Sequence, residues 1–307
     1  MDQLVTTLTR ADNLPILAMV PTTIVLIWLW LRVARRNDRL VDDGGVDAVR
    51  AAMEGPRPER GDDDDPDLGR VHTWPYLVRV ELLATLIVIL VLTIWSIGID
   101  APLEQMADPT RTPNPSKAPW YFLGLQEMLV YFDPWIAGVL LPLLIIGGLC
   151  AIPYVDVNPE GSGYYSWKRR RFAISVFLFG FLVLWLLLIL IGVTCRGPGW
   201  NWFWPWQTWD RERVVSTATR NWSDVFGIAP GPGALLFGAA TVLGYYGLGA
   251  LYWFRRRGRS PTLQRMGPAR YTIAAFLLLT MLALPIKIAL RLALDVKYVW
   301  VTPWFHV

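Results

Sequence analysis

The sequence predicts an all-α, polytopic membrane protein with six transmembrane helices and one short helix at the outer membrane interface. Three observations predict this class. Of the 307 residues, 54% are apolar and only 18% are charged, which is too little polar surface to coat a water-soluble globule. The apolar residues are gathered in long blocks. The chain also has 17 tryptophans, a residue that favours the headgroup boundary of a bilayer.

Six apolar blocks are long enough to cross a bilayer, which takes about 20 residues at ~1.5 Å per residue. The first block could be mistaken for a cleavable signal peptide, but it has an acidic start and is followed by RVARR, so we expect a retained anchor. The blocks cover residues 14–33, 76–98, 134–153, 172–195, 234–254 and 271–292.

Basic residues indicate which side of the membrane each loop occupies, because lysine and arginine are retained on the cytoplasmic side. Residues 34–75, 154–171 and 255–270 carry 17 lysines and arginines, whereas the four opposite segments carry 8. We therefore expect both termini on the outer, periplasmic side of a bacterial inner membrane. The pI near 9.1 reflects this topology, and a nucleic-acid partner is not expected.

The long inner segment differs in composition from the spans. Residues 34–75 contain eleven acids and few apolar side chains, which predicts a flexible charged linker. A calcium site at the Asp62–Asp65 run is disfavoured, because these acids lack the spacing around a turn that calcium needs. The predicted organisation is an anchor span at 1–33, this linker at 34–75, a three-span domain at 76–195, a Trp-rich outer segment at 196–233 and a two-span extension at 234–307.

The sequence offers few ligands for a redox centre. Its two histidines are His72 and His306, and its two cysteines, Cys150 and Cys195, are predicted at opposite membrane faces. There is no C-x-x-C-H and no C-x-x-C. We therefore expect no metal on this chain, and any electron carrier must sit on a partner.

The loop after the second block carries the most informative pattern. Four prolines at positions 109, 113, 115 and 119 stiffen it by fixing φ. From Trp120 the pattern becomes helical, with Tyr121, Leu125, Met128 and Phe132 on one apolar stripe. This predicts a short interfacial helix that ends at Asp133-Pro134.

This order of parts resembles the C-terminal half of cytochrome b, or the separate subunit IV, of quinol–cytochrome c reductases (cytochrome bc complexes). The resemblance runs from about Pro75 to Cys195 and is strongest in ADPTRTPNPSKAPWYFLGLQEML. It implies an outer quinol-oxidising pocket, beside a separate di-haem cytochrome b that holds the b haems. It further implies a Rieske iron-sulfur protein and a c-type cytochrome as partners. The natural quinol, ubiquinol or menaquinol, is left open.

The sequence departs from the family motif at its acid. The family has Pro-Glu-Trp-Tyr, whereas this chain reads Ala118-Pro119-Trp120-Tyr121. Quinol oxidation needs a base, and Glu127 is the nearest following carboxylate in apolar surroundings. We hypothesise that Glu127 accepts the proton; the alternative is a solvated or salt-bridged Glu127 on the polar side of the helix. The residues that the resemblance places at the quinol are Pro119, Trp120, Tyr121, Phe122 and Met128.

Three other patterns carry weaker predictions. The alternating tryptophans at 200, 202, 204 and 206 predict an extended strip, which either anchors in lipid or docks a redox partner with Arg196 at its rim. Lys287, Arg291 and Asp295 share one face of the last span and can pair or snorkel. Gly244, Gly247 and Gly249 predict close helix packing.

The sequence therefore favours a membrane subunit of a quinol–cytochrome c oxidoreductase, without a redox centre of its own, that forms the quinol pocket and a proton route. One alternative is a non-catalytic scaffold in a respiratory complex, because the motif acid is missing. A transporter is less favoured, because no internal repeat and no charged mid-span helices are evident.

Overall fold

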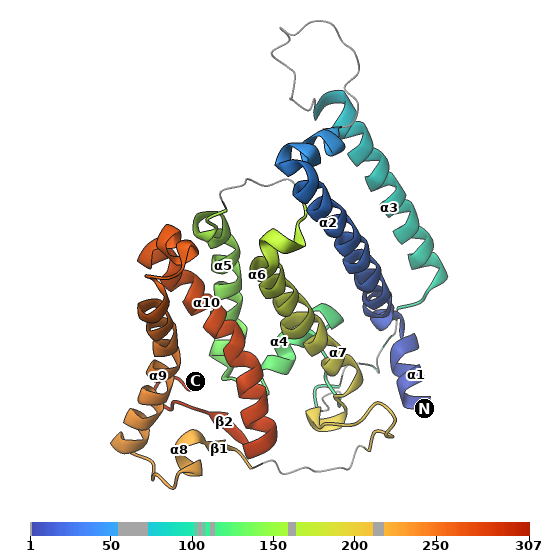
Figure 1. Ribbon diagram of the computed structural model, residues 1–307. Helices are drawn as coiled ribbons and strands as arrows, with labels where there is room; N and C mark the ends of the chain where they lie inside the picture. The colour runs from blue at the N-terminus through green and yellow to red at the C-terminus, as the bar shows by residue number, and fades with distance from the viewer. Residues whose placement is uncertain are drawn as a thin grey trace, which may run out of the picture. The chain divides into compact units, whose positions relative to one another are not determined.

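The computed structural model describes residues 2–54, 73–101, 103, 106, 108–110, 114–158, 164–210 and 218–307. The Asp62–Asp65 run lies outside the described residues. The α-helices of the protein (Figure 1) are α1 (Asp2–Thr9), α2 (Leu14–Glu54), α3 (Val78–Gly98), α4 (Leu123–Met128), α5 (Leu141–Val155), α6 (Trp167–Leu178), α7 (Leu187–Thr194), α8 (Trp222–Val225), α9 (Pro232–Arg256) and α10 (Pro261–Leu294). The short strands β1 (Arg220–Asn221) and β2 (Val296–Tyr298) pair in parallel.

The helical fold and the six predicted spans are confirmed. Six helical segments are long and apolar enough to cross a bilayer. Phe179–Leu186 joins α6 to α7 in one continuous span. The six segments are Ala11–Val49, Thr73–Gly98, Ile136–Val155, Trp167–Thr194, Pro232–Arg256 and Pro261–Leu294.

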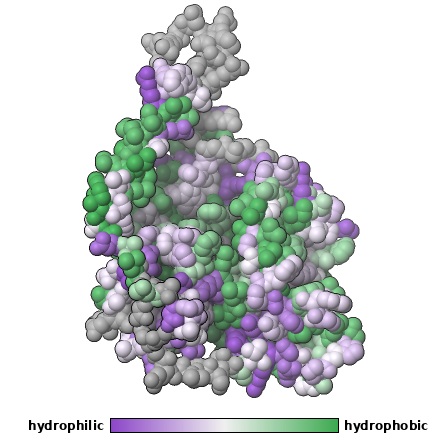
Figure 2. Space-filling view, turned by 180° about the vertical axis from the view of Figure 1, so that it is seen from behind, coloured by the Kyte–Doolittle hydropathy of each residue, from purple (hydrophilic) through white to green (hydrophobic). Residues whose placement is uncertain are grey.

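The spans expose apolar side chains, as a bilayer requires. Green, apolar residues lie on the surface of the visible face in Figure 2. The extreme case is α3, in which none of the 21 residues is buried.

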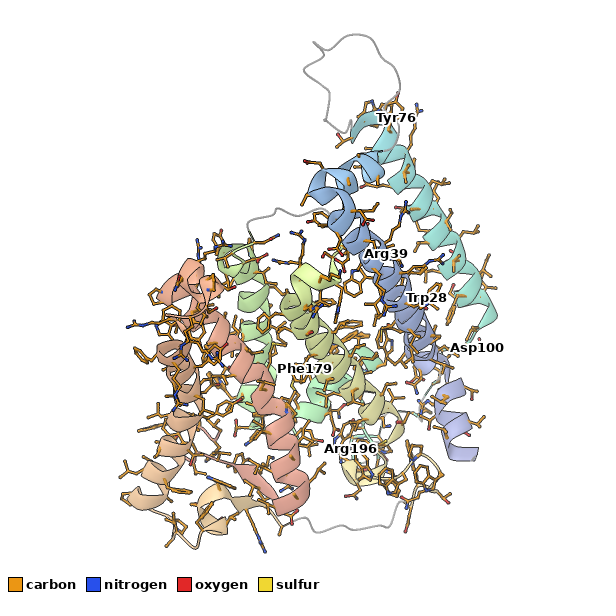
Figure 3. The ribbon with its side chains drawn as sticks, viewed as in Figure 1. Trp28, Arg39, Tyr76, Asp100, Phe179 and Arg196 are labelled. Carbon is orange, nitrogen blue, oxygen red and sulfur yellow. The ribbon has the colours of Figure 1, made fainter. Side chains whose placement is uncertain are left out.

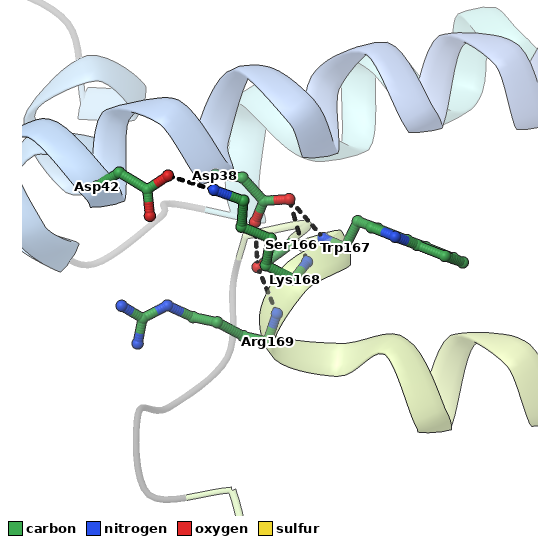
Figure 4. A network of polar contacts seen from close by, with 6 residues as sticks. All are labelled: Asp38, Asp42, Ser166, Trp167, Lys168 and Arg169. Atoms are coloured by element: carbon green, nitrogen blue, oxygen red, sulfur yellow. Dashed lines mark hydrogen bonds and ion pairs between the residues drawn. The ribbon is translucent and has the colours of Figure 1, made fainter.

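One compact unit contains residues 8–110 and 164–169, with α2 and α3. Within it, α2 provides an acceptor for the first residues of α6. The Asp38 carboxylate accepts the Ser166 hydroxyl at 2.5 Å and the backbone N–H groups of Trp167 and Lys168 at 3.1 Å each (Figure 4). A carboxylate at this position also complements the positive end of the helix dipole. Lys168 forms an ion pair with Asp42 on the next turn of α2.

These contacts correct the prediction for the start of the linker. Residues 34–54 are helical and continue α2, although their polar composition predicted a flexible segment. The helical backbone is interrupted at Gly45, whose positive φ of 73° is a conformation that glycine adopts without steric cost. Composition missed the helix because its polar side chains have partners: besides Asp38, Asn37 donates to the Tyr165 carbonyl at 2.9 Å.

The other compact unit contains residues 111–163 and 170–307, after a short N-terminal piece. It comprises α4, α5, most of α6, α7 and the α9–α10 hairpin. Its core lies where the segment after α4 meets α7 and α10, and consists of Met128, Tyr131, Phe132, Ile136, Ala137, Leu188 and Leu284. The polypeptide around α4 is thus the centre of the packing of this unit, rather than a connector on its surface.

The glycines of α9 divide between two environments. A Cβ on Gly249 would meet Leu279 of α10 at 3.2 Å, so this glycine packs closely as predicted. A Cβ on Gly244 or Gly247 would meet nothing within 4 Å. These two glycines have no close packing partner among the described residues.

Gly238 of α9 makes the closest approach to the C-terminal segment. A Cβ there would lie 2.7 Å from the Val299 carbonyl oxygen and 2.9 Å from the Trp300 Cα. We expect Gly238→Ala to destabilise the protein by about 1–3 kcal/mol, because backbone atoms must move to admit the methyl group. Thermal unfolding of the purified protein in detergent measures this effect. Gly244→Ala is the control, and equal melting temperatures for the two variants would contradict the close contact.

At the end of the last span, the three charged residues that were expected to pair or snorkel do not pair with one another. Lys287 is buried, donates to the Lys297 carbonyl and lies over the Phe132 ring at 5.2 Å. Arg291 donates to the backbone oxygen of Asp295 at 2.9 Å. Among the described residues, the side chains of Lys287, Arg291 and Asp295 form no ion pair with one another, because backbone carbonyls satisfy the two cations.

Candidate functional site

The candidate site begins where the proline-rich loop joins α4. Pro119 precedes the helical turn Trp120–Phe122, and Leu123 then begins α4. Gln126 ties the loop back to the helix, because its side chain accepts the Ala118 N–H at 2.9 Å and donates to the Ser116 carbonyl at 3.0 Å. The loop end and α4 therefore form one unit.

The first turn of α4 packs closely against α7. A Cβ on Gly192 of α7 would lie 3.1 Å from the Leu123 Cβ, and a Cβ on Gly124 would lie 3.4 Å from the Ile189 side chain. Lys117 strengthens the contact by donating to the Val193 carbonyl at 2.9 Å. Small residues on both helices thus permit the close approach.

A buried ion pair fixes the second half of α4. Both carboxylate oxygens of Glu127 are bound by Arg196, with Nε at 2.8 Å from Oε2 and Nη2 at 2.6 Å from Oε1. The Tyr131 hydroxyl donates to Oε1 at 2.7 Å. Glu127 is 0% exposed and Arg196 6% exposed. Arg196 follows α7 directly, as labelled in Figure 3, so this bidentate pair joins α4 to the end of α7.

The surroundings of Tyr131 and Arg196 keep both side chains protonated. Burial raises the pKa of Tyr131 well above its usual value, and the negative charge of Glu127 adds to the rise. Burial alone would lower the pKa of Arg196, but hydrogen bonds and charge attraction from Glu127 outweigh it and raise this pKa. Tyr131 therefore stays a hydrogen-bond donor and Arg196 stays a cation at physiological pH.

The loop that carries Arg196 is a tight turn. The Phe203 N–H donates to the Cys195 carbonyl at 2.9 Å and the Gly197 N–H to the Asn201 carbonyl at 3.1 Å. The Arg196 Nη1 donates to the Trp200 carbonyl at 3.2 Å, and its guanidinium lies 5.4 Å from the Trp202 ring centre. The turn thus encloses the cation on the side away from Glu127.

This turn corrects the prediction of an extended strip of tryptophans. Gly199 and Trp200 both have positive φ, 64° and 58°, so the chain reverses before Trp202. Trp204 and Trp206 stack at 5.3 Å between ring centres and remain exposed. Alternation could not reveal the turn, because a glycine and a tryptophan in left-handed conformation interrupt it.

A short helix after Trp120 is confirmed, but α4 ends at Met128, before the predicted Asp133-Pro134, and its buried face is rotated. Met128 and Phe132 are buried as predicted, at 7% and 5% exposure. Tyr121 is 48% exposed, and Leu125 is only partly buried. The buried face instead includes Glu127, which a hydropathy pattern assigns to the polar side. Arg196 reverses that assignment by neutralising the carboxylate inside the protein.

The residues that the resemblance places at the quinol divide into two groups. Pro119, Tyr121 and Phe122 are exposed and Trp120 is partly exposed. The Tyr121 and Phe122 rings lie 4.7 Å apart, and Trp120 packs edge-on against Tyr121 at 5.6 Å. These three residues form an open aromatic edge. Met128 lies behind it in the core, so the structure does not bring all five residues to one surface.

Asp133 ends the segment and starts the next span. Its carboxylate accepts the Trp135 N–H at 3.0 Å, the contact expected of a helix cap. The other oxygen lies 3.5 Å from the His306 Nδ1. His306, near the C-terminus, therefore packs beside the segment that contains Phe132 and Asp133.

The Trp-rich pattern predicts Arg196 at the rim of a docking surface and does not reveal its role as the partner of Glu127. A signal was available: the predicted outer segments have few basic residues, and Arg196 follows an apolar span directly. Such a cation needs a nearby acid, and Glu127 is an acid in apolar surroundings. Among the described residues, no group of three or more His, Cys, Asp or Glu side chains could hold a metal ion.

The fold and site together define a multi-pass helical membrane protein with an amphipathic segment clamped at one end of its spans. Residues 106–204 of this chain match the family model described as cytochrome b (C-terminal)/b6/petD. This match confirms the resemblance for α4–α7 and the Arg196 turn. The match begins after α3, whereas the resemblance seen in the sequence runs from about Pro75 and so includes α3.

Two curated proteins are similar to the chain. The menaquinol:cytochrome c reductase cytochrome c subunit of Geobacillus thermodenitrificans is 29% identical over 137 residues, covering 43% of this chain and 51% of that protein. The protein of the same name from Bacillus subtilis (strain 168) is 31% identical over 103 residues, covering 31% and 38%. The chain thus spans about half the length of the first and less of the second. No solved structure matches the chain.

Proposed function

We propose that this chain is a membrane subunit of a menaquinol:cytochrome c oxidoreductase, and that its Trp120–Phe122 edge forms one wall of the quinol-oxidation pocket. The observation that carries this proposal is the clamped α4 segment, which lies inside the match to the cytochrome b C-terminal family. Menaquinol is the chosen donor because both similar proteins are named for it.

The proposed partners carry the redox centres for which this sequence has too few ligands. With two histidines in the sequence, it cannot supply the two histidine pairs that two membrane haems need. A separate di-haem cytochrome b therefore completes the pocket and takes one of the two electrons of the quinol, while a Rieske iron-sulfur protein takes the other and passes it to a c-type cytochrome. The positive-inside rule places the pocket and both termini on the periplasmic side of a bacterial inner membrane.

The aromatic edge suits a quinol ring. Trp120, Tyr121 and Phe122 offer flat apolar faces at the start of α4, and the Tyr121 hydroxyl offers one hydrogen bond. The buried Glu127–Arg196 ion pair behind them fixes their position and is not itself part of the exposed aromatic edge. A rigid wall of this kind holds a quinol head at a constant distance from the acceptors on the partner subunits.

Glu127 is better suited to positioning this wall than to accepting a proton from quinol. Both its oxygens are occupied by Arg196, one of them also by Tyr131, and the carboxylate is 0% exposed. A proton-accepting role would require the carboxylate to leave a buried cation unpaired. That role remains a prediction, which the variants described in the Discussion separate from positioning.

Replacing Tyr121 by alanine tests the proposed wall. We expect kcat/KM for menaquinol to fall about 10-fold in the assembled complex, because an aromatic contact contributes about 1–1.5 kcal/mol. The measurement is menaquinol-dependent reduction of cytochrome c by membranes, with haem content used to normalise the amount of complex. Tyr154→Ala is the matched control, since Tyr154 is also exposed and lies at the other end of α5.

The opposite result favours a second candidate function. The motif acid is absent and Glu127 is engaged by Arg196, as expected if the chain were a non-catalytic scaffold of a respiratory complex. Unchanged kcat/KM in the Tyr121→Ala complex, with normal haem content, would establish that reading over the proposed one.

A further inference from the structure

The connection between α9 and α10, with the helix ends beside it, carries a dense group of positive charges. Six arginines lie within 16 positions, and every one of them is exposed. We call them the arginine cluster: Arg255, Arg256, Arg257, Arg259, Arg265 and Arg270. The cluster lies outside residues 106–204, the part that matches a known family.

Nothing in the surrounding sequence neutralises this charge. No aspartate or glutamate occurs between Asp224 and Asp295, so the whole α9–α10 hairpin is free of acids. Among the described residues, the ion pairs all involve other cations. The basic end of α2 differs, because Arg35, Arg36 and Arg39 alternate there with four aspartates at 38, 42, 43 and 47.

Four members of the arginine cluster, Arg255, Arg256, Arg257 and Arg259, line an open hollow of about 800 Å³. Phe254 and Gly258 complete its lining, so residues that carry four positive charges and one apolar ring border the same open space. Phe254 is 67% exposed, and the Arg257 guanidinium lies 5.6 Å from its ring centre. A ligand held here would meet several cations together with an apolar flank.

Aromatic residues place this hollow at the boundary of the bilayer. Tyr252, Trp253 and Tyr271 lie next to the arginine cluster, and the Trp253 and Tyr271 rings are 4.8 Å apart. The Tyr271 hydroxyl donates to the Gly249 carbonyl at 2.7 Å and joins the two helices. Tyrosine and tryptophan concentrate at the level of the lipid headgroups. The arginines directly beyond them are therefore at the level of the phosphates.

We propose that the arginine cluster binds the phosphodiester headgroup of an anionic phospholipid, with Phe254 against the start of its acyl chains. Guanidinium groups bind phosphate oxygens in pairs of parallel hydrogen bonds, which suits several arginines around one hollow. Because the α9–α10 hairpin contains no acid, the negative charge that balances these arginines is supplied by the ligand. A lipid meets both requirements of the hollow, charge and an apolar flank, whereas a free phosphate ion meets only the first.

The test uses the full chain purified in detergent and titrated with short-chain phosphatidylglycerol. We expect the triple variant Arg255→Gln, Arg257→Gln, Arg259→Gln to bind this lipid about 100-fold more weakly, because each basic residue near an anionic lipid contributes a factor of about 5. The control variant, Arg35→Gln, Arg36→Gln, Arg39→Gln, removes the same charge from α2 and is expected to bind within about threefold of the parent.

Two further arms distinguish the source of the phosphate and guard against misfolding. Phosphatidylcholine and inorganic phosphate, at matched concentrations, are expected not to displace phosphatidylglycerol. In the unmodified chain, phosphatidylglycerol is expected to slow trypsin cleavage at Arg255–Arg259 at least fivefold, whereas phosphatidylcholine leaves it unchanged. The proposal is overturned if both triple variants lose affinity equally, if inorganic phosphate competes as well as the lipid, or if an acidic peptide protects these arginines while the lipid does not.

Discussion

Replacing Arg196 alone by glutamine is expected to lower the free energy of unfolding by about 3–5 kcal/mol, because Glu127 then remains buried with its charge unpaired. Glu127→Gln alone should cost a similar amount, since it leaves Arg196 buried without its acid. The double variant Glu127→Gln, Arg196→Gln removes both charges and allows the two amides to bond. We expect the double variant to be more stable than either single variant, a coupling that unfolding in detergent measures.

The same three variants decide between the two roles of Glu127. If Glu127 positions α4, the double variant recovers most of the quinol-oxidation activity that each single variant loses. If Glu127 accepts the proton, activity stays low in the double variant despite its recovered stability, and the pH dependence of kcat changes. Tyr131→Phe is the control, because it removes one hydrogen bond to Glu127 and leaves the ion pair in place.

The contact between α4 and α7 supplies the second large effect. In Gly192→Leu, the new Cβ would lie 3.1 Å from the Leu123 Cβ and 3.4 Å from the Leu123 carbonyl oxygen, with a longer side chain beyond it. We expect a loss of about 3 kcal/mol in the free energy of unfolding. Quinol oxidation should also fall by more than 10-fold, because α4 must move away from α7 and carry the aromatic edge with it.

Gly147→Leu is the matched control for this experiment. Gly147 lies in α5, another span, and a Cβ there would meet nothing within 4 Å. Both substitutions add the same side chain to a transmembrane helix, so a difference between them reports the α4–α7 contact. Equal stability and equal activity of the two variants would show that this contact does not position α4.

The spans were predictable because a single physical quantity, the length of an apolar block, decides whether a helix can cross lipid. The position of the short helix after Trp120 followed equally from its periodicity and from Pro119. The buried face of this helix did not follow from these patterns, because the partner that allows Glu127 to be buried is Arg196, 69 positions later in the chain. The periodicity of the segment itself cannot reveal a partner at that distance.

Two other differences have the same cause. Composition predicts a linker from residue 34 onward, but Asn37 and Asp38 are satisfied by Tyr165 and Ser166, each 128 positions away. The tryptophans after Cys195 were assigned to a strip on alternation, but positive φ at Gly199 and Trp200 turns the chain. In each case a polar contact or a special backbone conformation overrides the pattern.

The cap that Asp38 places on α6 bears on how this chain divides into modules. Residues 106–204 match a known family, and α6 lies within them, yet the carboxylate that satisfies the first amides of α6 comes from α2, outside the match. A fragment limited to residues 106–204 would begin α6 without this carboxylate. We therefore expect a truncated chain to need α2 for the first turn of α6 to be satisfied.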